Sequence, residues 1–170
     1  FAVCIGAVPF DYNQQEIRRT VISTNALRYE IPFVFVNHVG AHINVVYDGG
    51  SMVSNAHGQI VYEMECFAPQ MSIVDLAEVK NGTLKEIDVP NIPKIERIYK
   101  ALKMGLGDYF RRSGFSKAVL GLSGGIDSAV VATLMVDVLG KENVMGVLMP
   151  SEFSTDHSVR DAEDLAKNLG

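Results

Sequence analysis

The chain has no tryptophan and only two cysteines among its 170 residues. No stretch of it approaches the roughly 18 unbroken apolar residues that a membrane-spanning helix needs, which argues against a membrane protein. Neither Cys4 nor Cys66 lies in a Cys-x-x-Cys pair, and both lie in apolar, strand-like runs. We therefore expect two buried, reduced thiols in a cytoplasmic protein.

Basic residues are also scarce, since 15 Lys and Arg face 20 Asp and Glu, giving a net charge of −5. The excess of acid lies before residue 93, where 5 basic residues accompany 10 acidic ones. The sequence contains no basic stripe, so we expect no nucleic-acid partner. Hydrophobic residues at 48% and charged residues at 21% are typical of a folded chain and exclude disorder as its main content.

The two ends of the sequence suggest a piece of a longer protein. Phe1 opens an apolar run, and Gly170 directly follows a helical pattern. The first residues show neither the basic segment nor the cleavage site of a secretory signal.

The first half predicts one helix followed by short strands. Phe1–Gly6 is expected to be a buried strand, and the helix at Asn13–Glu30 is expected to bury an apolar face. That face comprises Ile17, Val21 and Leu27, and Pro32 ends the helix. Turn signals at Asp48-Gly49-Gly50 and Asn55–Gly58 predict two hairpins. The strands expected here are Phe33–Val36, Ile43–Tyr47, Ser51–Ser54, Gln59–Met64 and Met71–Leu76.

The pattern changes near Asp88–Ile92, where we place a boundary between a domain of residues 1–89 and one of residues 90–170. Apolar residues at helical spacing predict a helix over Pro93–Ser113, which Gly114 ends. The alternation of strand and helix that follows predicts a right-handed βαβ unit with a parallel sheet. Its elements are expected at Ala118–Leu120, Ile126–Leu139, Asn143–Met149 and His157–Leu169.

The most informative segment is Gly121–Ser128, which reads GLSGGIDS and lies between a predicted strand and a predicted helix. A glycine pair lets the backbone approach a ligand closely, and the start of the helix presents unpaired N–H groups and a partial positive charge. Ser123 and Ser128 add hydroxyl groups. This combination predicts a binding loop for phosphate. Asp127 would repel phosphate unless a cation lay between them, so we expect it to bind Mg²⁺.

Two better-known phosphate motifs do not match this segment. It lacks the lysine of G-x-x-x-x-G-K-[ST], and its glycine spacing is not G-x-G-x-x-G. A glycine-rich turn between strand and helix can also occur without a ligand, but the six-position pattern S-G-G-x-D-S is more specific than a glycine pair alone.

Ser123–Ser128 resembles the signature of the ATP pyrophosphatases, and the residues around it are similar to NAD⁺ synthetase. The similar flanking segments are residues 98–102, 107–110, 114–115, 149–151 and 161–170, together with Ser154 and Ser158. The first half resembles the last third of a nitrilase-type glutaminase domain, at residues 9–10, 36–40, 47–51 and 55–58. A nitrilase-like module fused ahead of this synthetase is the arrangement of the glutamine-dependent NAD⁺ synthetases.

This resemblance implies an α/β fold in two parts: the C-terminal part of a nitrilase-like αββα sandwich, then the start of a Rossmann-like, parallel-sheet ATP pyrophosphatase domain. It implies ATP-dependent amidation of deamido-NAD to NAD⁺ through an adenylate intermediate, with glutamine or ammonia as nitrogen donor. ATP and Mg²⁺ are the implied cofactors, and a homo-oligomer is the implied assembly. The alternatives are another ATP pyrophosphatase, such as a GMP or asparagine synthetase or a tRNA-thiolating enzyme, and a non-catalytic nucleotide-binding fragment.

The resemblance assigns the whole loop to ATP, namely Gly121, Leu122, Ser123, Gly124, Gly125, Ile126, Asp127 and Ser128, with Asp127 on the metal. Leu148 and Met149 are expected near adenine. Ser151 is expected either to approach the nucleotide or to serve only as a helix-entry residue. No catalytic residue is expected within the chain, because the family's cysteine nucleophile lies upstream of the matched region, which excludes Cys4.

The family often has a serine and a basic residue that help to hold glutamine. Val8 and Gln14 occupy those positions here.

Overall fold

The computed structural model describes residues 1–89, 92–150 and 156–170, and it shows an α/β protein that contains parallel strand pairs. The chain forms two compact units, Phe1–Gly105 and Leu106–Gly170. The division falls within the long helix α3 (Lys94–Ser113), which ends, as expected, at Gly114 in a left-handed conformation with φ +72°. The boundary near residue 90 stays a prediction.

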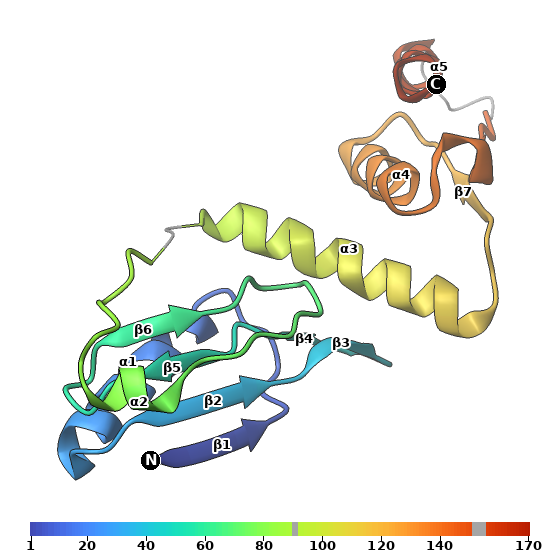
Figure 1. The fold of residues 1–170 in the computed structure, drawn as a ribbon. Helices are drawn as coiled ribbons and strands as arrows, with labels where there is room; N and C mark the ends of the chain where they lie inside the picture. Colours follow the sequence, from blue (N-terminus) through green and yellow to red (C-terminus); the bar gives the residue numbers. More distant parts are fainter. Residues whose placement is uncertain (90–91, 151–155) are drawn as a thin grey trace. The chain divides into compact units, whose positions relative to one another are not determined.

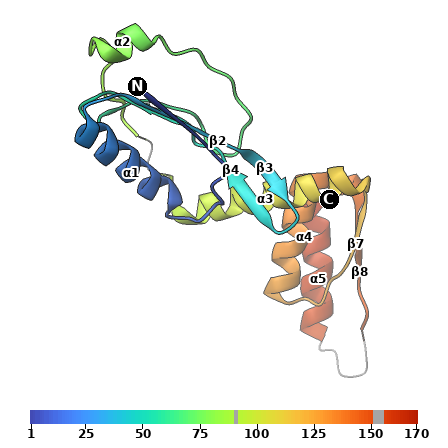
Figure 2. The ribbon, with the colours of Figure 1, turned by 90° about the horizontal axis from the view of Figure 1, so that it is seen from below.

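A four-stranded sheet forms the centre of the first unit (Figure 1). Its order is β1 (Ala2–Gly6), β2 (Phe33–Asn37), β5 (Met52–Ser54) and β6 (Ile60–Glu63). β1 and β2 are parallel and the other pairs antiparallel. Helices α1 (Gln14–Tyr29) and α2 (Leu76–Lys80) lie on opposite sides of the sheet in Figure 2. Each side has its own apolar cluster, the first built on Ile22, Phe35, Met52 and Ile60, the second on Val53, Val61 and Val79.

Of the two predicted hairpins, the one at Asn55–Gly58 is confirmed and joins β5 to β6. The one at Asp48-Gly49-Gly50 is wrong. The chain instead forms a hairpin from β3 (Val39–His42) and β4 (Val45–Asp48), and it then enters the main sheet at β5. Gly49 and Gly50 adopt φ of +71° and +63°, so their conformational freedom lets the chain pass from one sheet to another. The true turn contains Ile43, whose φ of +56° is unusual for a β-branched residue.

The strand predicted at Met71–Leu76 is also wrong. Met71 and Ile73 are exposed, whereas Val74 contacts the cluster around Val53. Asp75 then begins α2, because its side chain accepts a hydrogen bond from the N–H of Ala77 at 2.7 Å.

The first strand is correctly placed, but it is not buried. β1 lies at an edge of the sheet, with Val3 and Ile5 exposed. Cys4 is exposed for the same reason, and Cys66 is only partly buried, so the expectation of two buried thiols is wrong.

Helix α1 has the predicted extent but buries a different face. The apolar residues Ile17, Val21 and Leu27 are at least half exposed. The buried face instead contains Gln15, Arg18, Ile22 and Ala26. Arg18 donates two hydrogen bonds to Asp48, at 2.9 and 2.5 Å, and both side chains are at most 5% exposed. Charge pairing across the helix and β4 therefore sets the orientation of α1, which the apolar spacing alone does not show.

The second unit contains the predicted parallel pair, β7 (Ala118–Gly121) and β8 (Val144–Val147). Helices α4 (Ile126–Leu139) and α5 (Asp156–Leu169) lie side by side next to these strands (Figure 2), and a short 3₁₀ turn, η1 (Lys141–Asn143), precedes β8. Leu122, Ala132 and Ala162 form the buried core. Among the residues that the structure describes, no helix has both the length and the apolar character needed to cross a bilayer.

Replacing Asp48 with Asn should lower the free energy of unfolding by about 3–5 kcal/mol, because it leaves the Arg18 charge buried without a counter-ion. Urea unfolding followed by far-UV circular dichroism measures this effect in a chain without tryptophan. Glu96→Gln is the matched control, since the exposed pair of Glu96 with Lys100 should contribute less than about 1 kcal/mol. Equal effects of the two substitutions would contradict the assigned role of Asp48.

Burial, reinforced by the nearby Asp48 carboxylate, raises the pKa of the Cys66 thiol from 9.0 to about 11. The folded protein therefore keeps this thiol protonated at pH 8. Iodoacetamide should modify exposed Cys4 first, and the rate at Cys66 should rise about tenfold per pH unit until pH approaches its pKa. Peptide mass spectrometry measures both rates, with the urea-unfolded chain as control. Fast modification of Cys66 in the folded protein at pH 8 would contradict the shift.

Candidate functional site

The predicted phosphate loop connects the end of β7 to the start of α4, and Leu122 anchors it. The Leu122 N–H donates to the carbonyl oxygen of Val147 at 2.9 Å, and its side chain is buried in the core of the second unit. Gly146 makes room for that side chain, because a Cβ there would lie 2.5 Å from Leu122 Cδ1. Apolar packing therefore holds the residue that follows β7, and Ser123 after it is exposed.

Gly124 is required both by its conformation and by its neighbour. Its φ is +78°, and a Cβ at this position would overlap the backbone oxygen of Ser158 on α5. Gly125 follows as the N-cap of α4, in an extended conformation and with no side-chain cap. The N–H groups in the first turn of α4 therefore have no intrahelical partner and no capping side chain among the described residues, as a site for an anion requires.

The two serines of the loop meet across its turn. Ser123 and Ser128 have their hydroxyl oxygens 3.1 Å apart. The N–H of Ser123 donates to Ser128 Oγ at 3.3 Å, and the N–H of Gly125 donates to Ser123 Oγ at 3.3 Å. These contacts place both hydroxyl groups beside the exposed start of α4, as the sequence motif implies.

Asp127 lies in the first turn of α4 and is exposed. Its carboxylate forms no hydrogen bond or ion pair with the described residues, so its oxygens are available to a cation. The described residues contain no cluster of three potential metal ligands. Mg²⁺ commonly binds to one or two carboxylates together with phosphate oxygens and water, and Asp127 fits that mode of binding. The metal role of Asp127 stays a prediction.

The residues expected near adenine have different environments. Leu148 packs against the core of the second unit. Met149 is exposed, and its Cε lies 3.1 Å from the position that a Cβ on Gly121 would take, so its side chain borders the loop. Ile126 is also exposed. Ser151 lies outside the described residues.

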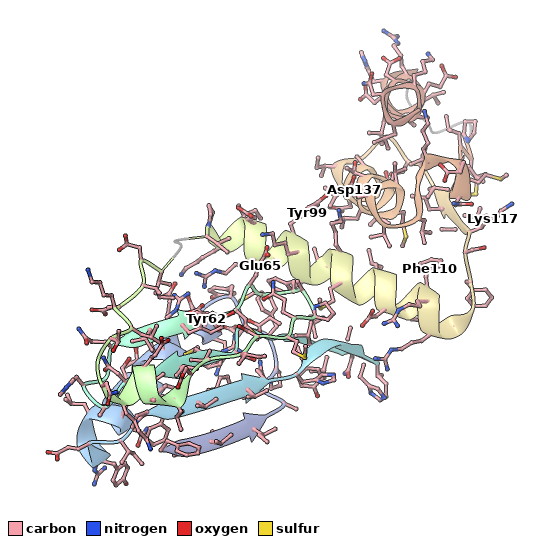
Figure 3. All side chains as sticks on the ribbon, in the orientation of Figure 1. Tyr62, Glu65, Tyr99, Phe110, Lys117 and Asp137 are labelled. Atoms are coloured by element: carbon pink, nitrogen blue, oxygen red, sulfur yellow. The ribbon has the colours of Figure 1, made fainter. Side chains whose placement is uncertain are left out.

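A cavity of about 420 Å³ opens between the loop and α5. The α5 residues that line it include Asp161, Asp164 and Asn168. The sequence analysis included these three positions only in the segment 161–170 that is similar to NAD⁺ synthetase, and it assigned none of them to the site. The spacing of three and four residues was the available signal, since it places all three on one side of a helix. Lys117 precedes β7, and Asp137 lies in the last turn of α4, at the opposite end of that helix from the loop (Figure 3).

In the first unit, Val8 packs against the apolar cluster under α1, and its N–H donates to Asn37 Oδ1 at 2.8 Å. Gln14 begins α1. Neither position carries the hydroxyl or the positive charge that the resemblance led us to expect for holding glutamine.

Gly124→Ala should disrupt the loop, because the new methyl group would overlap the backbone of Ser158. Gly114→Ala is the matched control: Gly114 has a similar φ of +72°, but no atom lies within 4 Å of the position that its new methyl group would take. We expect the control to lose about 1 kcal/mol of stability and Gly124→Ala to lose several times more. Thermal unfolding measures both, and equal losses would contradict the close packing of the loop against α5.

Comparison with known proteins agrees with the resemblance seen in the sequence. Residues 98–170 match the family model of NAD synthase. The glutamine-dependent NAD(+) synthetase of a Synechocystis species is 42% identical over 170 residues, covering 99% of this chain and 30% of that protein. The enzyme of the same name from Thermotoga maritima is 34% identical, over 98% of this chain and 34% of that protein.

Solved structures agree with this result. The glutamine-dependent NAD+ synthetase from Acinetobacter baumannii, in complex with adenosine diphosphate, superposes with a TM-score of 0.90 at 32% identity. It is matched over 99% of this chain and 32% of its own. The protein of that name from Cytophaga hutchinsonii, at 19% identity and a TM-score of 0.78, supports the fold alone. The chain spans about a third of the length of these relatives, is similar to glutamine-dependent NAD(+) synthetases along nearly all of its own length, and carries the NAD synthase pattern over residues 98–170.

Proposed function

We propose that the chain is part of a glutamine-dependent NAD⁺ synthetase. In this proposal residues 1–89 are the C-terminal portion of a nitrilase-like glutaminase domain. Residues 90–170 are the ATP-binding start of a Rossmann-like synthetase domain. The observation that carries the proposal is the loop Gly121–Ser128 next to a parallel strand pair. It combines the N–H groups of a helix start and two hydroxyl groups with a carboxylate that has no partner among the described residues.

The reaction explains why such a loop is needed. A carboxylate oxygen of deamido-NAD attacks the α-phosphorus of ATP, the bond to the β-phosphate oxygen breaks, and pyrophosphate leaves. The nitrogen of ammonia then attacks the activated carbonyl carbon, AMP leaves, and the amide of NAD⁺ remains. Negative charge builds up on pyrophosphate in the first step, so the enzyme gains most by fixed positive groups placed around it.

The residues of this chain would act at that first step. The N–H groups at the start of α4 and the hydroxyl of Ser123 would hold the phosphate oxygens and stabilise the leaving pyrophosphate. Asp127 would hold Mg²⁺, whose charge offsets that of the phosphates. Met149, which borders the loop, would offer an apolar contact to the nucleoside. The ADP complex of the Acinetobacter baumannii relative supports nucleotide binding by this fold.

Glutamine or free ammonia is the proposed nitrogen donor. With Val8 and Gln14 at the two expected glutamine-holding positions, the proposal assigns no glutamine-binding residue to this chain. Self-association and a cytoplasmic location stay predictions.

Mg-ATP should bind to the chain, and Asp127→Asn and Ser123→Ala should weaken that binding. We expect a loss of about 10- to 100-fold for Asp127→Asn, the effect of removing a charged ligand, and a smaller loss for Ser123→Ala. Isothermal titration calorimetry measures the affinities. Asp137→Asn, a change of the same charge at the far end of α4, is the control and should have no effect. Unchanged affinity in both loop variants would exclude the phosphate loop.

The intact protein that contains this chain should release pyrophosphate from ATP only when deamido-NAD is present. Another ATP pyrophosphatase would release it with a different acceptor, and a non-catalytic nucleotide-binding protein would release none. A coupled pyrophosphate assay distinguishes the three cases. The 170-residue chain alone should show neither this activity nor glutaminase activity.

A further inference from the structure

We infer that Ser128 is a positioning residue of the phosphate loop, which holds Ser123 and Gly125 in place so that Ser123 can contact phosphate. The inference rests on the proposed nucleotide-binding function and assigns different roles to two serines that the sequence motif treats alike.

Ser128 is the residue on which the hydrogen bonds of the loop converge. Its hydroxyl donates to the carbonyl oxygen of Gly125 at 2.9 Å and accepts from the N–H of Ser123 at 3.3 Å. It also lies 3.1 Å from the hydroxyl oxygen of Ser123. One side chain in the first turn of α4 therefore contacts the loop both before and after the glycine pair.

The direction of these bonds follows from the number of protons. A serine hydroxyl has one proton to donate, and the proton of Ser128 is used on the oxygen of Gly125. In the contact between the two hydroxyls, Ser123 must therefore be the donor. The result is a short relay in which Ser123 donates to Ser128 and Ser128 donates to Gly125.

The relay gives the two serine hydroxyls different freedom to donate a hydrogen bond to phosphate. Ser123 lies in the loop and is exposed, so its hydroxyl group can rotate from Ser128 toward an incoming phosphate. Ser128 is partly buried and is fixed by the helix. If Ser128 donated to phosphate, it would lose its hydrogen bond to the Gly125 carbonyl. When the Ser123 hydroxyl turns instead, Ser128 keeps its bonds to the Ser123 N–H and the Gly125 carbonyl. Ser128 therefore acts on phosphate through Ser123 and Gly125.

A double-mutant cycle tests this division of roles. We expect Ser123→Ala and Ser128→Ala each to weaken Mg-ATP binding about five- to tenfold, as removal of one neutral hydrogen bond does. Because the two residues act in series, the double variant should lose no more than about tenfold. Ser128→Thr, which keeps the hydroxyl, should restore affinity to within about twofold of the original. Thr133→Val is the matched control, since the Thr133 hydroxyl bonds to the Ala129 carbonyl further along α4.

A second measurement reports on the loop directly. In ¹⁵N–¹H spectra without nucleotide, Ser128→Ala should shift the amide signals of Ser123 and Gly125, and Thr133→Val should leave them in place. Losses of affinity that multiply in the double variant, failure of Ser128→Thr to restore binding, or unmoved amide signals would each overturn the inference while leaving the proposed function intact. A chain that does not bind Mg-ATP, yet shows the amide shifts, would refute the proposed function and retain Ser128 as the residue that shapes the loop.

Discussion

The backbone of α5 at Ser158 lies so close to Gly124 that no side chain fits between them, and the shape of the proposed phosphate loop depends on this contact. Leu122 fixes the loop to the core on one side, and α5 supports it on the other. Between these supports the chain turns through a left-handed glycine and enters α4 with its first N–H groups uncapped. Packing on both sides therefore determines the shape of this short turn.

The first unit relies on a different constraint, a polar layer under α1. Arg18 pairs with Asp48, while Arg19 and Gln15 both donate to Glu63. Such pairs add little stability over apolar residues of similar size, but each becomes costly when one partner is missing. The layer therefore fixes the rotation of α1 about its axis and so determines which residues face the sheet. Cys66 lies beside this layer, where burial and the Asp48 carboxylate raise the pKa of its thiol and keep it protonated.

The loop and its surroundings together account for the proposed chemistry. Helix N–H groups suit the phosphate oxygens, and an exposed carboxylate with no partner among the described residues suits a cation beside them. The hydroxyl relay gives the loop a defined shape before any nucleotide arrives, so less ordering is needed on binding. Similarity to NAD(+) synthetases over nearly the whole chain agrees with this chemistry, and the loop supplies the physical reason for it.

The sequence by itself determined the helices α3, α4 and α5 and the parallel pair of the second unit, because caps, helical spacing and glycine positions are local signals. The same signals placed Gly121–Ser128 between β7 and α4, while its role in binding phosphate stays a prediction. Two predictions from local signals were wrong. At Asp48-Gly49-Gly50 the chain passes from one sheet to another instead of forming a hairpin, and Met71–Leu76 leads into α2 instead of forming a strand. Only the tertiary structure decided which face of α1 is buried, because a buried Arg18 is acceptable only next to Asp48, 30 residues away. It also decided that α5 closes the loop at Gly124 and that Asp161 and Asp164 border its cavity, since contacts between distant elements leave no trace in local spacing.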